Sequence, residues 1–429
     1  MAGSRIIRNI SQWLDLRIIL LILAGEAAFL LPFVLPRIFR PTVLSVFEMN
    51  NQSLGSCFSV YGIVALLSYL FGGPIADRFQ PRLLIAIALL STSVGGFVTA
   101  TYPSHSIMLL VYGYWGFTTI FLLWAAMLKA TRQWGGATKQ GRAFGFLDGG
   151  RGLVSAMLGS ASVIIFSLTM ATETGTEASL EHQQTAFRYV ILFTSGLVAL
   201  VGILVWFFLD TTSDSDAPID RKLSLGDILS ALSLPSVWLL MFVVLCGYVG
   251  YKVTDDLSLY AKEVMLFDEV RAAQLGTFLL YLRPIVGVAA GFLADWSRSA
   301  TWIIAGFASM LIGAVIVGMG VTEPGAYGIF FASLFATCIG VYAIRSLYFA
   351  AMQEGKIPLP ITGTAIGLIS VIGYTPDIFM GPVSGYLLDG WPGEPGHQYL
   401  FWLLAGFSAV GLVVSIIFRM LSTQAQPEA

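Results

Sequence analysis

Long apolar stretches, separated by short polar clusters, form the pattern of this chain. The apolar stretches are about 20 residues long, and a helix that crosses the ~30 Å hydrocarbon core of a membrane needs about that length at 1.5 Å per residue. Each stretch is therefore predicted to be a membrane-spanning helix. The predicted spans are residues 17–38, 54–75, 82–101, 106–129, 143–169 and 188–209, followed by 235–260, 272–294, 301–320, 327–352, 361–387 and 398–419.

One polar stretch is longer than the others and divides the spans into two sets. It runs from Asp210 to Leu223 with the sequence DTTSDSDAPIDRKL, which is rich in turn-forming residues. The predicted fold class is an all-α membrane protein of twelve transmembrane helices in two six-helix bundles. The N-terminal bundle is expected over residues 1–209, the linker over 210–234 and the C-terminal bundle over 235–429.

The composition supports this interpretation and excludes several classes of protein. Of the 429 residues, 56% are hydrophobic and 11% are charged, whereas a soluble globular chain has about 25% charged residues. The three cysteines lie inside apolar stretches without the spacing of a disulfide framework or a metal site. The sequence contains no catalytic constellation, metal-ligand spacing or nucleotide-binding loop. We therefore expect no enzyme, no cofactor, no metal and no nucleic-acid partner.

The distribution of lysine and arginine predicts the orientation in the membrane. With the N-terminus inside, the outer loops contain only Arg37, Arg40, Arg188, Lys262 and Arg271, and most other basic residues fall on the cytoplasmic side. Cytoplasmic loops are enriched in lysine and arginine, so both termini are expected in the cytoplasm. The first apolar stretch lacks a small-residue cleavage site and is expected to remain as a helix. We expect a monomer in a bacterial inner membrane.

Two short motifs recur at nearly the same offset. The motif Gly-x-x-x-Asp occurs at Gly73 and Asp77 and again at Gly291 and Asp295, 218 residues further along the chain. Gly-x-Ala-x-Gly occurs at residues 141–145 and again at 363–367, an offset of 222. Two matches at similar offsets indicate that the second half repeats the first in the same orientation.

These features together resemble the major facilitator superfamily of secondary transporters. The signature of its loop after the second span, Gly-x-x-x-Asp-Arg/Lys-x-Gly-Arg-Arg/Lys, is matched at Gly73, Asp77, Arg78 and Arg82, and it is broken at Gln80-Pro81. The resemblance implies a conformational latch at these four positions, with Gly291, Asp295 and Arg298 in the repeat. Charge anchoring at the membrane surface would explain Arg78 and Arg82, but not the repeated aspartate.

The resemblance implies alternating access but does not identify a substrate. Antiporters of this superfamily that exchange drugs for protons usually carry an arginine within span four and Gly-x-x-x-Gly-Pro in span five. Here residues 112–128 contain no arginine, and span five instead contains Leu147-Asp-Gly-Gly-Arg151-Gly. Drug efflux is therefore a weaker interpretation.

Charged residues inside the predicted spans are the candidate functional residues, because each is costly to insert into a membrane. Glu26, Arg151 and Arg283 lie deepest: Glu26 and Arg151 are ~14–15 Å into the membrane by helical rise, and Arg283, twelve residues past Arg271, is again near the middle. The alternative for Arg151 is a structural bridge to Asp148, three residues earlier on the helix. In span seven, Lys252 shares a helix face with Tyr248 and is either a substrate contact or a local partner of Asp255 or Asp256.

The predicted sites follow from the chemistry of these groups. Several arginine and lysine side chains in an apolar cleft would select an anion, and a low-dielectric surrounding disfavours the charged form of a carboxylate, which makes a buried acid a candidate proton carrier. Aromatic residues crowd span four, where a side chain could contact substrate. The expected substrate-binding residues are Arg151, Lys252, Arg283, Arg345, Tyr248, Tyr251 and Trp115; the expected proton-coupling residues are Glu26, then Asp377 and Asp148.

Three functions remain open from the sequence. The first is proton-coupled uptake of a small organic anion, which the deep basic residues favour. The second is transport of a larger amphiphile such as a siderophore or a drug, which the aromatic residues of span four favour. The third, a membrane sensor or enzyme without transport, has no supporting motif.

Overall fold

The computed structural model describes residues 15–135, 140–171, 179–210, 225–322, 324–358 and 361–424, and within these ranges every regular element is a helix. Eleven helical stretches among the described residues are long and apolar enough to cross a membrane. Helix α5 (Asn51–Arg78) is 28 residues long, which corresponds to ~42 Å and completes the twelve predicted spans. The predicted linker lies largely outside the described residues, which resume at α11 (Leu225–Leu232).

The chain forms two compact units, and the first comprises Met1–Pro36, Ser45–Phe47 and Val60–Pro218. Within this unit, α6 packs against α10, and α2 packs against both α9 and α10. The elements of the first half of the chain, some of which also contribute residues to the second unit, are α2 (Leu16–Phe29), η1 (Leu30–Val34), α3 (Leu35–Ile38), α4 (Arg40–Val46), α5 (Asn51–Arg78), α6 (Pro81–Thr99), α7 (His105–Gly116), η2 (Phe117–Trp124), α8 (Ala125–Gly135), α9 (Gln140–Met170) and α10 (Leu180–Phe208).

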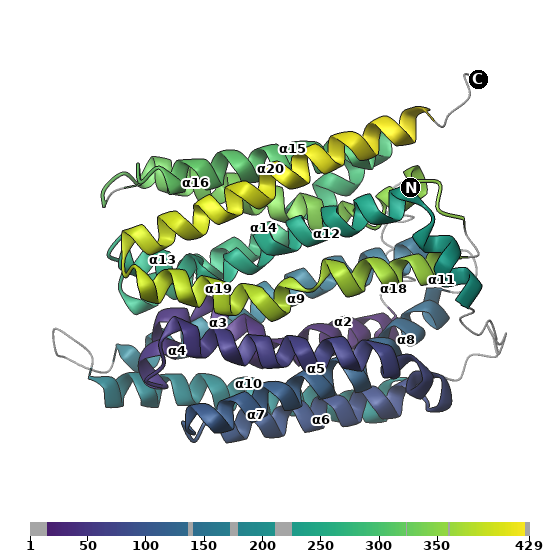
Figure 1. The fold of residues 1–429 in the computed structure, drawn as a ribbon. Helices are drawn as coiled ribbons and strands as arrows, with labels where there is room; N and C mark the ends of the chain where they lie inside the picture. Colours follow the sequence, from purple (N-terminus) through teal and green to yellow (C-terminus); the bar gives the residue numbers. More distant parts are fainter. Residues whose placement is uncertain are drawn as a thin grey trace, which may run out of the picture. The chain divides into compact units, whose positions relative to one another are not determined.

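The second unit comprises Arg37–Leu44, Glu48–Ser59 and Ile219–Ala429. In it, α15 lies beside α16 and α20, as Figure 1 shows, and α12 contacts α16, α18 and α20. Its elements are α11 (Leu225–Leu232), α12 (Pro235–Val253), η3 (Thr254–Asp256), α13 (Leu257–Glu263), α14 (Glu269–Trp296), α15 (Ser299–Gly318), α16 (Tyr327–Leu347), α17 (Ala351–Glu354), α18 (Thr362–Gly373), α19 (Pro376–Gly390) and α20 (Glu394–Gln424), together with the first part of α5.

Several helix ends follow directly from local sequence. Helices α6, α12 and α19 begin with proline, which suits the first turn because its missing N–H has no partner there. The side chains of Asp15, Ser179 and Asp268 cap α2, α10 and α14 by accepting a hydrogen bond from a backbone N–H of the first turn. Proline at position 376 also explains why the eleventh span is divided at Tyr374–Thr375 into α18 and α19.

Two of the spans in the first unit contain π-helical segments. The segment η1 includes Pro32, whose lack of an N–H prevents the regular α-helical hydrogen bond. The segment η2 extends over eight residues and ends at Trp124. Such segments are rare and occur frequently at functional sites, and both lie next to aromatic residues that are described below.

In the second unit, the start of α5 packs very closely against α19. A Cβ atom on Gly55 would overlap the carbonyl oxygen of Gly381, and one on Gly385 would lie 2.6 Å from the Cα of Gln52. The carboxylate of Asp389 caps α5 across this contact, accepting hydrogen bonds from the backbone N–H of Asn51 at 3.0 Å and of Gln52 at 2.7 Å. Glycine at the crossing lets the two backbones approach.

Candidate functional site

A cluster of buried charges surrounds the end of α12 in the second unit. The helix tightens into the 3₁₀ turn η3, which places two consecutive aspartates against different partners. Arg37 Nε donates to Asp255 at 2.6 Å, and Arg40 pairs with Asp256 at 2.9 Å. All four side chains are almost completely buried. We call these residues, together with Lys252, Asp377, Tyr248 and Tyr251, the α12 charge cluster.

Lys252 lies at the branch point of this cluster. Its Nζ is 2.9 Å from Asp255 and 3.5 Å from Asp377, and it also lies 4.8 Å from the centre of the Phe58 ring. The local pair with Asp255, expected from the sequence as one of two alternatives, is therefore present in the structure. The additional contact with Asp377 connects α12 to the first turn of α19.

Two tyrosine side chains contact the charged groups of the α12 charge cluster. The hydroxyl of Tyr248 donates to the carboxylate of Asp377, at 3.0 Å from Oδ2. The ring of Tyr251 contacts two guanidinium groups, with the Cζ of Arg37 at 4.3 Å and that of Arg345 at 4.2 Å from its centre. Cation–π contacts of this kind stabilise a cation more strongly when water is excluded. Both tyrosines predicted as substrate contacts thus lie in the same cluster as Lys252, and both contact Arg345.

Arg283 and Arg345 extend this positively charged region towards α14 and α16. Arg283 is buried and lies beside Pro284 within α14. A small pocket adjoins the cluster; its lining residues are Arg40, Phe58, Lys252, Asp255, Asp256, Met380, Gly381 and Ser384.

Basic side chains gather around α12 in the second unit. Among its described residues, the buried or half-buried cations around α12 are Arg37, Arg40, Lys252, Arg283 and Arg345. The corresponding carboxylates are Asp255, Asp256 and Asp377. Buried charges of this kind are costly unless they are paired.

The first unit contains a simpler arrangement around Glu26 and Arg151. Arg151 Nε lies 3.3 Å from the Glu26 carboxylate and donates to the carbonyl oxygen of Gly25 at 3.1 Å. The arginine also lies over the rings of Phe29 and Trp124, at 5.3 and 5.5 Å from their centres. Phe29 precedes η1 and Trp124 ends η2, so the two π-helical segments position the aromatic residues of this site.

Glycine makes room for the Arg151 side chain. A Cβ on Gly25 would lie 2.7 Å from the sulfur of Met127 and 3.0 Å from Cδ of Arg151. Arg151, which the sequence left as a possible partner of Asp148, makes an ion pair with Glu26 of α2. Asp148 itself is exposed, one turn away on α9. Its assignment as a proton-coupling residue stays a prediction.

Trp115, the remaining predicted substrate contact, is part of helix packing in the first unit. Its indole Nε1 donates to the carbonyl oxygen of Thr92 at 3.0 Å, and the side chain is buried against Gly95. A buried tryptophan requires such a partner for its N–H. Packing therefore accounts for the burial of Trp115, and its role as a substrate contact stays a prediction.

The predicted latch residues lie at helix ends with different surroundings. Arg78 and Arg82 are exposed, and the surroundings of Gly73 and of the Asp77 side chain fall outside the described part of the structure. In the repeat, Asp295 is exposed, Gly291 has open space around it, and Arg298 donates to the hydroxyl of Thr423. The latch stays a prediction.

Glu354, which the sequence did not single out, binds the first turn of a neighbouring helix. Its carboxylate accepts hydrogen bonds from the backbone N–H groups of Ser299 and Ala300, the first residues of α15. A carboxylate at a helix N-terminus satisfies free donors and complements the helix dipole.

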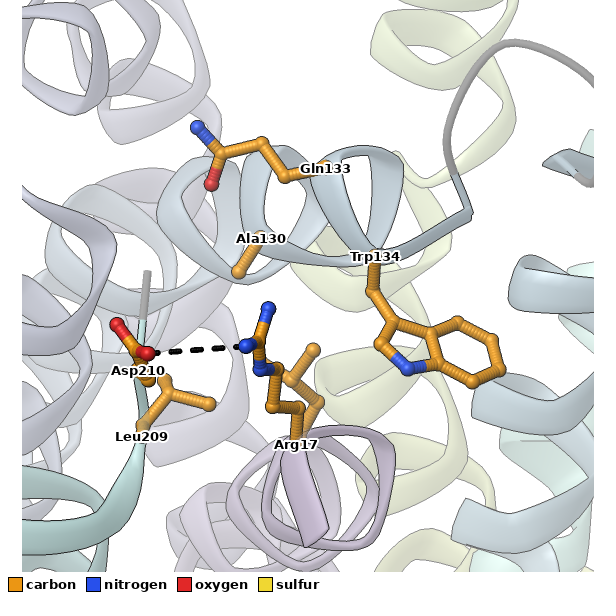
Figure 2. A pocket seen from close by; sticks show the side chains of 7 residues that line it. Arg17, Ala130, Gln133, Trp134, Leu209 and Asp210 are labelled. Carbon is orange, nitrogen blue, oxygen red and sulfur yellow. Dashed lines mark ion pairs between the residues drawn. The ribbon is translucent and has the colours of Figure 1, made fainter. Parts of the chain in front are cut away.

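A further charged group lies where α2 begins. Figure 2 shows Arg17 directed towards Asp210, with the two groups 3.6 Å apart, beside Gln133 and Trp134 of α8. Both side chains are at least one-third exposed. An exposed ion pair of this kind contributes little to stability. It is best explained as an anchor for the N-terminal end of α2.

Arg37 and Arg40 are the functional candidates that sequence reasoning missed, since both were expected in an outer loop. They follow Leu35-Pro36 and precede Pro41 at the end of the first apolar stretch. Their spacing of three residues would put them on one helix face. That spacing was the available signal, but it did not identify the aspartates that they bind.

The helical fold and its buried charge clusters define a polytopic membrane protein of the transporter class. The family model of the Major Facilitator Superfamily matches residues 18–376. The chain therefore belongs to the Major Facilitator Superfamily, and it is a membrane transporter, as the sequence motifs predicted.

Two bacterial relatives are similar over nearly the full length. The inner membrane protein YqcE of Escherichia coli (strain K12) is 29% identical over 419 residues, covering 95% of this chain and 94% of the relative. The inner membrane protein YihN of the same organism is 25% identical over 417 residues, covering 95% of this chain and 96% of the relative. The family and these relatives identify the chain as an integral membrane protein.

Solved structures of transporters share the fold. A mutant of the nucleoside transporter NupG superposes with a TM-score of 0.70 at 14% identity, covering 94% of this chain and 99% of that chain. A bacterial homologue of the human lysosomal transporter Spinster also superposes with a TM-score of 0.70, at 15% identity and with 95% and 96% coverage. At these identities the similarity concerns the fold alone.

Proposed function

We propose that this transporter takes up a small organic anion together with protons, by alternating access. The observation that supports the proposal is the group of five buried or half-buried basic side chains around α12, which are Arg37, Arg40, Lys252, Arg283 and Arg345. Arginine and lysine side chains that converge where little water is present suit a carboxylate or a phosphate. The inner membrane and cytoplasmic termini expected from the sequence belong to the same proposal.

Arg283 and Arg345 are the proposed anion-binding residues. The planar guanidinium group presents several donors in a fixed geometry that matches a carboxylate or a phosphate. Arg345 is held by the rings of Tyr248, at 5.8 Å, and Tyr251, at 4.2 Å. Arg283 is buried on α14 next to a proline, where the helix cannot form its regular hydrogen bond.

A larger substrate with a ring is the second candidate. The rings of Tyr248 and Tyr374 have centres 4.8 Å apart, and the hydroxyls of Tyr348 and Tyr374 are 3.0 Å apart. A patch of tyrosines beside arginine could stack on an aromatic or sugar-like group while the guanidinium binds an acidic one. This observation concerns α12, α16 and α18 rather than the aromatic residues of span four.

Uptake into proteoliposomes tests both candidates. Radiolabelled gluconate, glucose 6-phosphate and the neutral nucleoside uridine would be supplied separately, each with and without an inward proton gradient. We expect accumulation of an anion but not of uridine, and faster uptake with the gradient. Accumulation of uridine alone would contradict the anion proposal and the need for an acidic group in the second candidate.

Arginine variants on one helix sharpen the test. Arg283→Ala should lower uptake of the transported anion roughly tenfold or more, because a hydrogen bond to a charged group contributes about 1.5–3 kcal/mol. Arg271→Ala is the matched control, since Arg271 lies on the same helix α14 with a side chain that is 72% exposed. Equal uptake by the two variants would exclude Arg283 from the site.

A further inference from the structure

We infer that Asp377 is the proton-binding residue of this transporter and that Lys252 transmits its protonation to the pair of Arg37 and Asp255. The inference rests on the proposed function, because it names the residue through which protons act. It also reverses the order of candidates given by the sequence, which placed Glu26 first. The contacts of the α12 charge cluster carry it.

Exposure of the side chain to water distinguishes Asp377 from the other buried acids. Its side chain is 17% exposed, whereas those of Asp255, Asp256 and Glu26 are 5%, 3% and 3% exposed. A proton that enters or leaves a buried carboxylate needs a route to water. Of these four acids, Asp377 has the most open one.

Asp377 is also held less tightly by its cation. Lys252 lies 3.5 Å from Asp377 but 2.9 Å from Asp255, and Asp255 has a second cation, Arg37, at 2.6 Å. The other contact of Asp377 is with the neutral hydroxyl of Tyr248. Protonation of Asp377 therefore breaks one long ion pair, while protonation of Asp255 would break two short ones.

The contacts specify what protonation does to the rest of the cluster. Arg37, Lys252, Asp255 and Asp377 form an alternating chain of two cations and two acids with no net charge. A neutral Asp377 leaves this chain with one positive charge. Lys252 then interacts more strongly with Asp255 and competes there with Arg37, so the hold of Asp255 on the segment Arg37–Leu44 weakens.

The groups that face Asp377 support this direction. Tyr248 of α12 bonds to its carboxylate, and Arg345 of α16 lies over the ring of Tyr248. Arg40 and Asp256 form a neighbouring pair of zero net charge. Each proton taken up thus adds one positive charge next to Arg345, which couples the binding of one proton to the binding of one negative charge.

The inference is tested by following the distance between the start of α5 and α19 without any substrate. Spin labels are attached to Glu48→Cys, an exposed residue before α5, and Tyr386→Cys, a residue of α19 that is 64% exposed, after the three buried native cysteines are replaced by alanine. Distances are measured in lipid nanodiscs at pH 8.5 and pH 5.5. In the labelled protein with its native charge cluster, the distances between the two labels should be longer at pH 5.5 than at pH 8.5.

Variants identify the residues responsible. Asp377→Asn, which resembles the protonated acid, should give the low-pH distribution at both pH values, and Lys252→Met should remove the response to pH. Glu26→Gln is the control and should retain the full response. A complete pH response in Asp377→Asn would overturn the inference, as would loss of the response in Glu26→Gln alone.

A conservative variant of Asp377 distinguishes loss of the carboxylate from misfolding. Asp377→Glu should recover at least part of the pH response, which a merely unfolded variant could not. Because no substrate is present, a pH response that depends on Asp377 together with no uptake of any anion would contradict the anion proposal and leave this inference standing. The opposite result, anion uptake without an Asp377-dependent response, would overturn the inference alone.

Discussion

Two buried ionic sites, one in each compact unit, differ in how their charges are shared. In the first unit, Glu26 and Arg151 form one ion pair, enclosed by Phe29, Trp124 and the carbonyl of Gly25. In the second unit, Asp255 is bound by both Arg37 and Lys252, and Lys252 also reaches Asp377. A single pair has one arrangement, whereas a branched cluster can redistribute its contacts when one member changes charge. This difference makes the second site the better candidate for coupling.

The largest effect is expected from removing the shared acid. Asp255→Asn leaves Arg37 and Lys252 competing for weaker partners, and breaking a buried ion pair costs about 3–5 kcal/mol. The free energy of unfolding, measured by titration with sodium dodecyl sulfate, should fall by that amount. Asp295→Asn, at an exposed position on α14, is the control and should change it little. A loss below about 1 kcal/mol would show that Asp255 does not hold the cluster together.

An intermediate effect is expected at the helix crossing that supports the cluster. Gly55→Ala should destabilise the protein by about 1–3 kcal/mol, because the added methyl group overlaps the backbone of α19 at Gly381. Gly196→Ala in α10 is the matched control: no atom lies within 4 Å of its added Cβ, and alanine favours a helix. Equal stability of the two variants would mean that α5 and α19 do not pack as described.

The smallest effect is expected when the whole pair of the first unit is replaced. Glu26→Leu combined with Arg151→Met should change the free energy of unfolding by about 1 kcal/mol or less, because a buried ion pair can be replaced by apolar residues of similar size at little cost. The corresponding double variant in the second unit, Arg37→Met with Asp255→Leu, should remain strongly destabilised, since Lys252 loses its closest carboxylate. Similar losses in the two double variants would remove the contrast between the sites.

The fold could be predicted in detail because the membrane imposes it. Backbone groups in hydrocarbon must be satisfied within the segment, so an apolar stretch of about 20 residues has helix as its stable form. The predicted spans at 17–38 and 235–260 agree with the observed stretches Leu16–Ile38 and Pro235–Glu263. The repeated motifs at Gly73 and Gly291 indicated the superfamily that the family comparison confirms.

The buried charges could be listed from the sequence, but their partners could not. Helical periodicity correctly suggested a local contact between Lys252 and Asp255, which are three residues apart. It could not pair Arg37 with Asp255, because these residues are 218 positions apart and belong to different predicted bundles. The same limit applies to the contact between Asp389 and the start of α5.

The sequence alone therefore determined the class of protein, the helices and the set of costly charges, since each depends on local composition and on the length of the apolar stretches. Only the tertiary structure decided that Glu26 pairs with Arg151, that Asp255 pairs with both Arg37 and Lys252, and that Asp377 remains partly accessible. Pairing and access depend on which helices pack together, and the packing of distant segments brings together charges that no local pattern can relate.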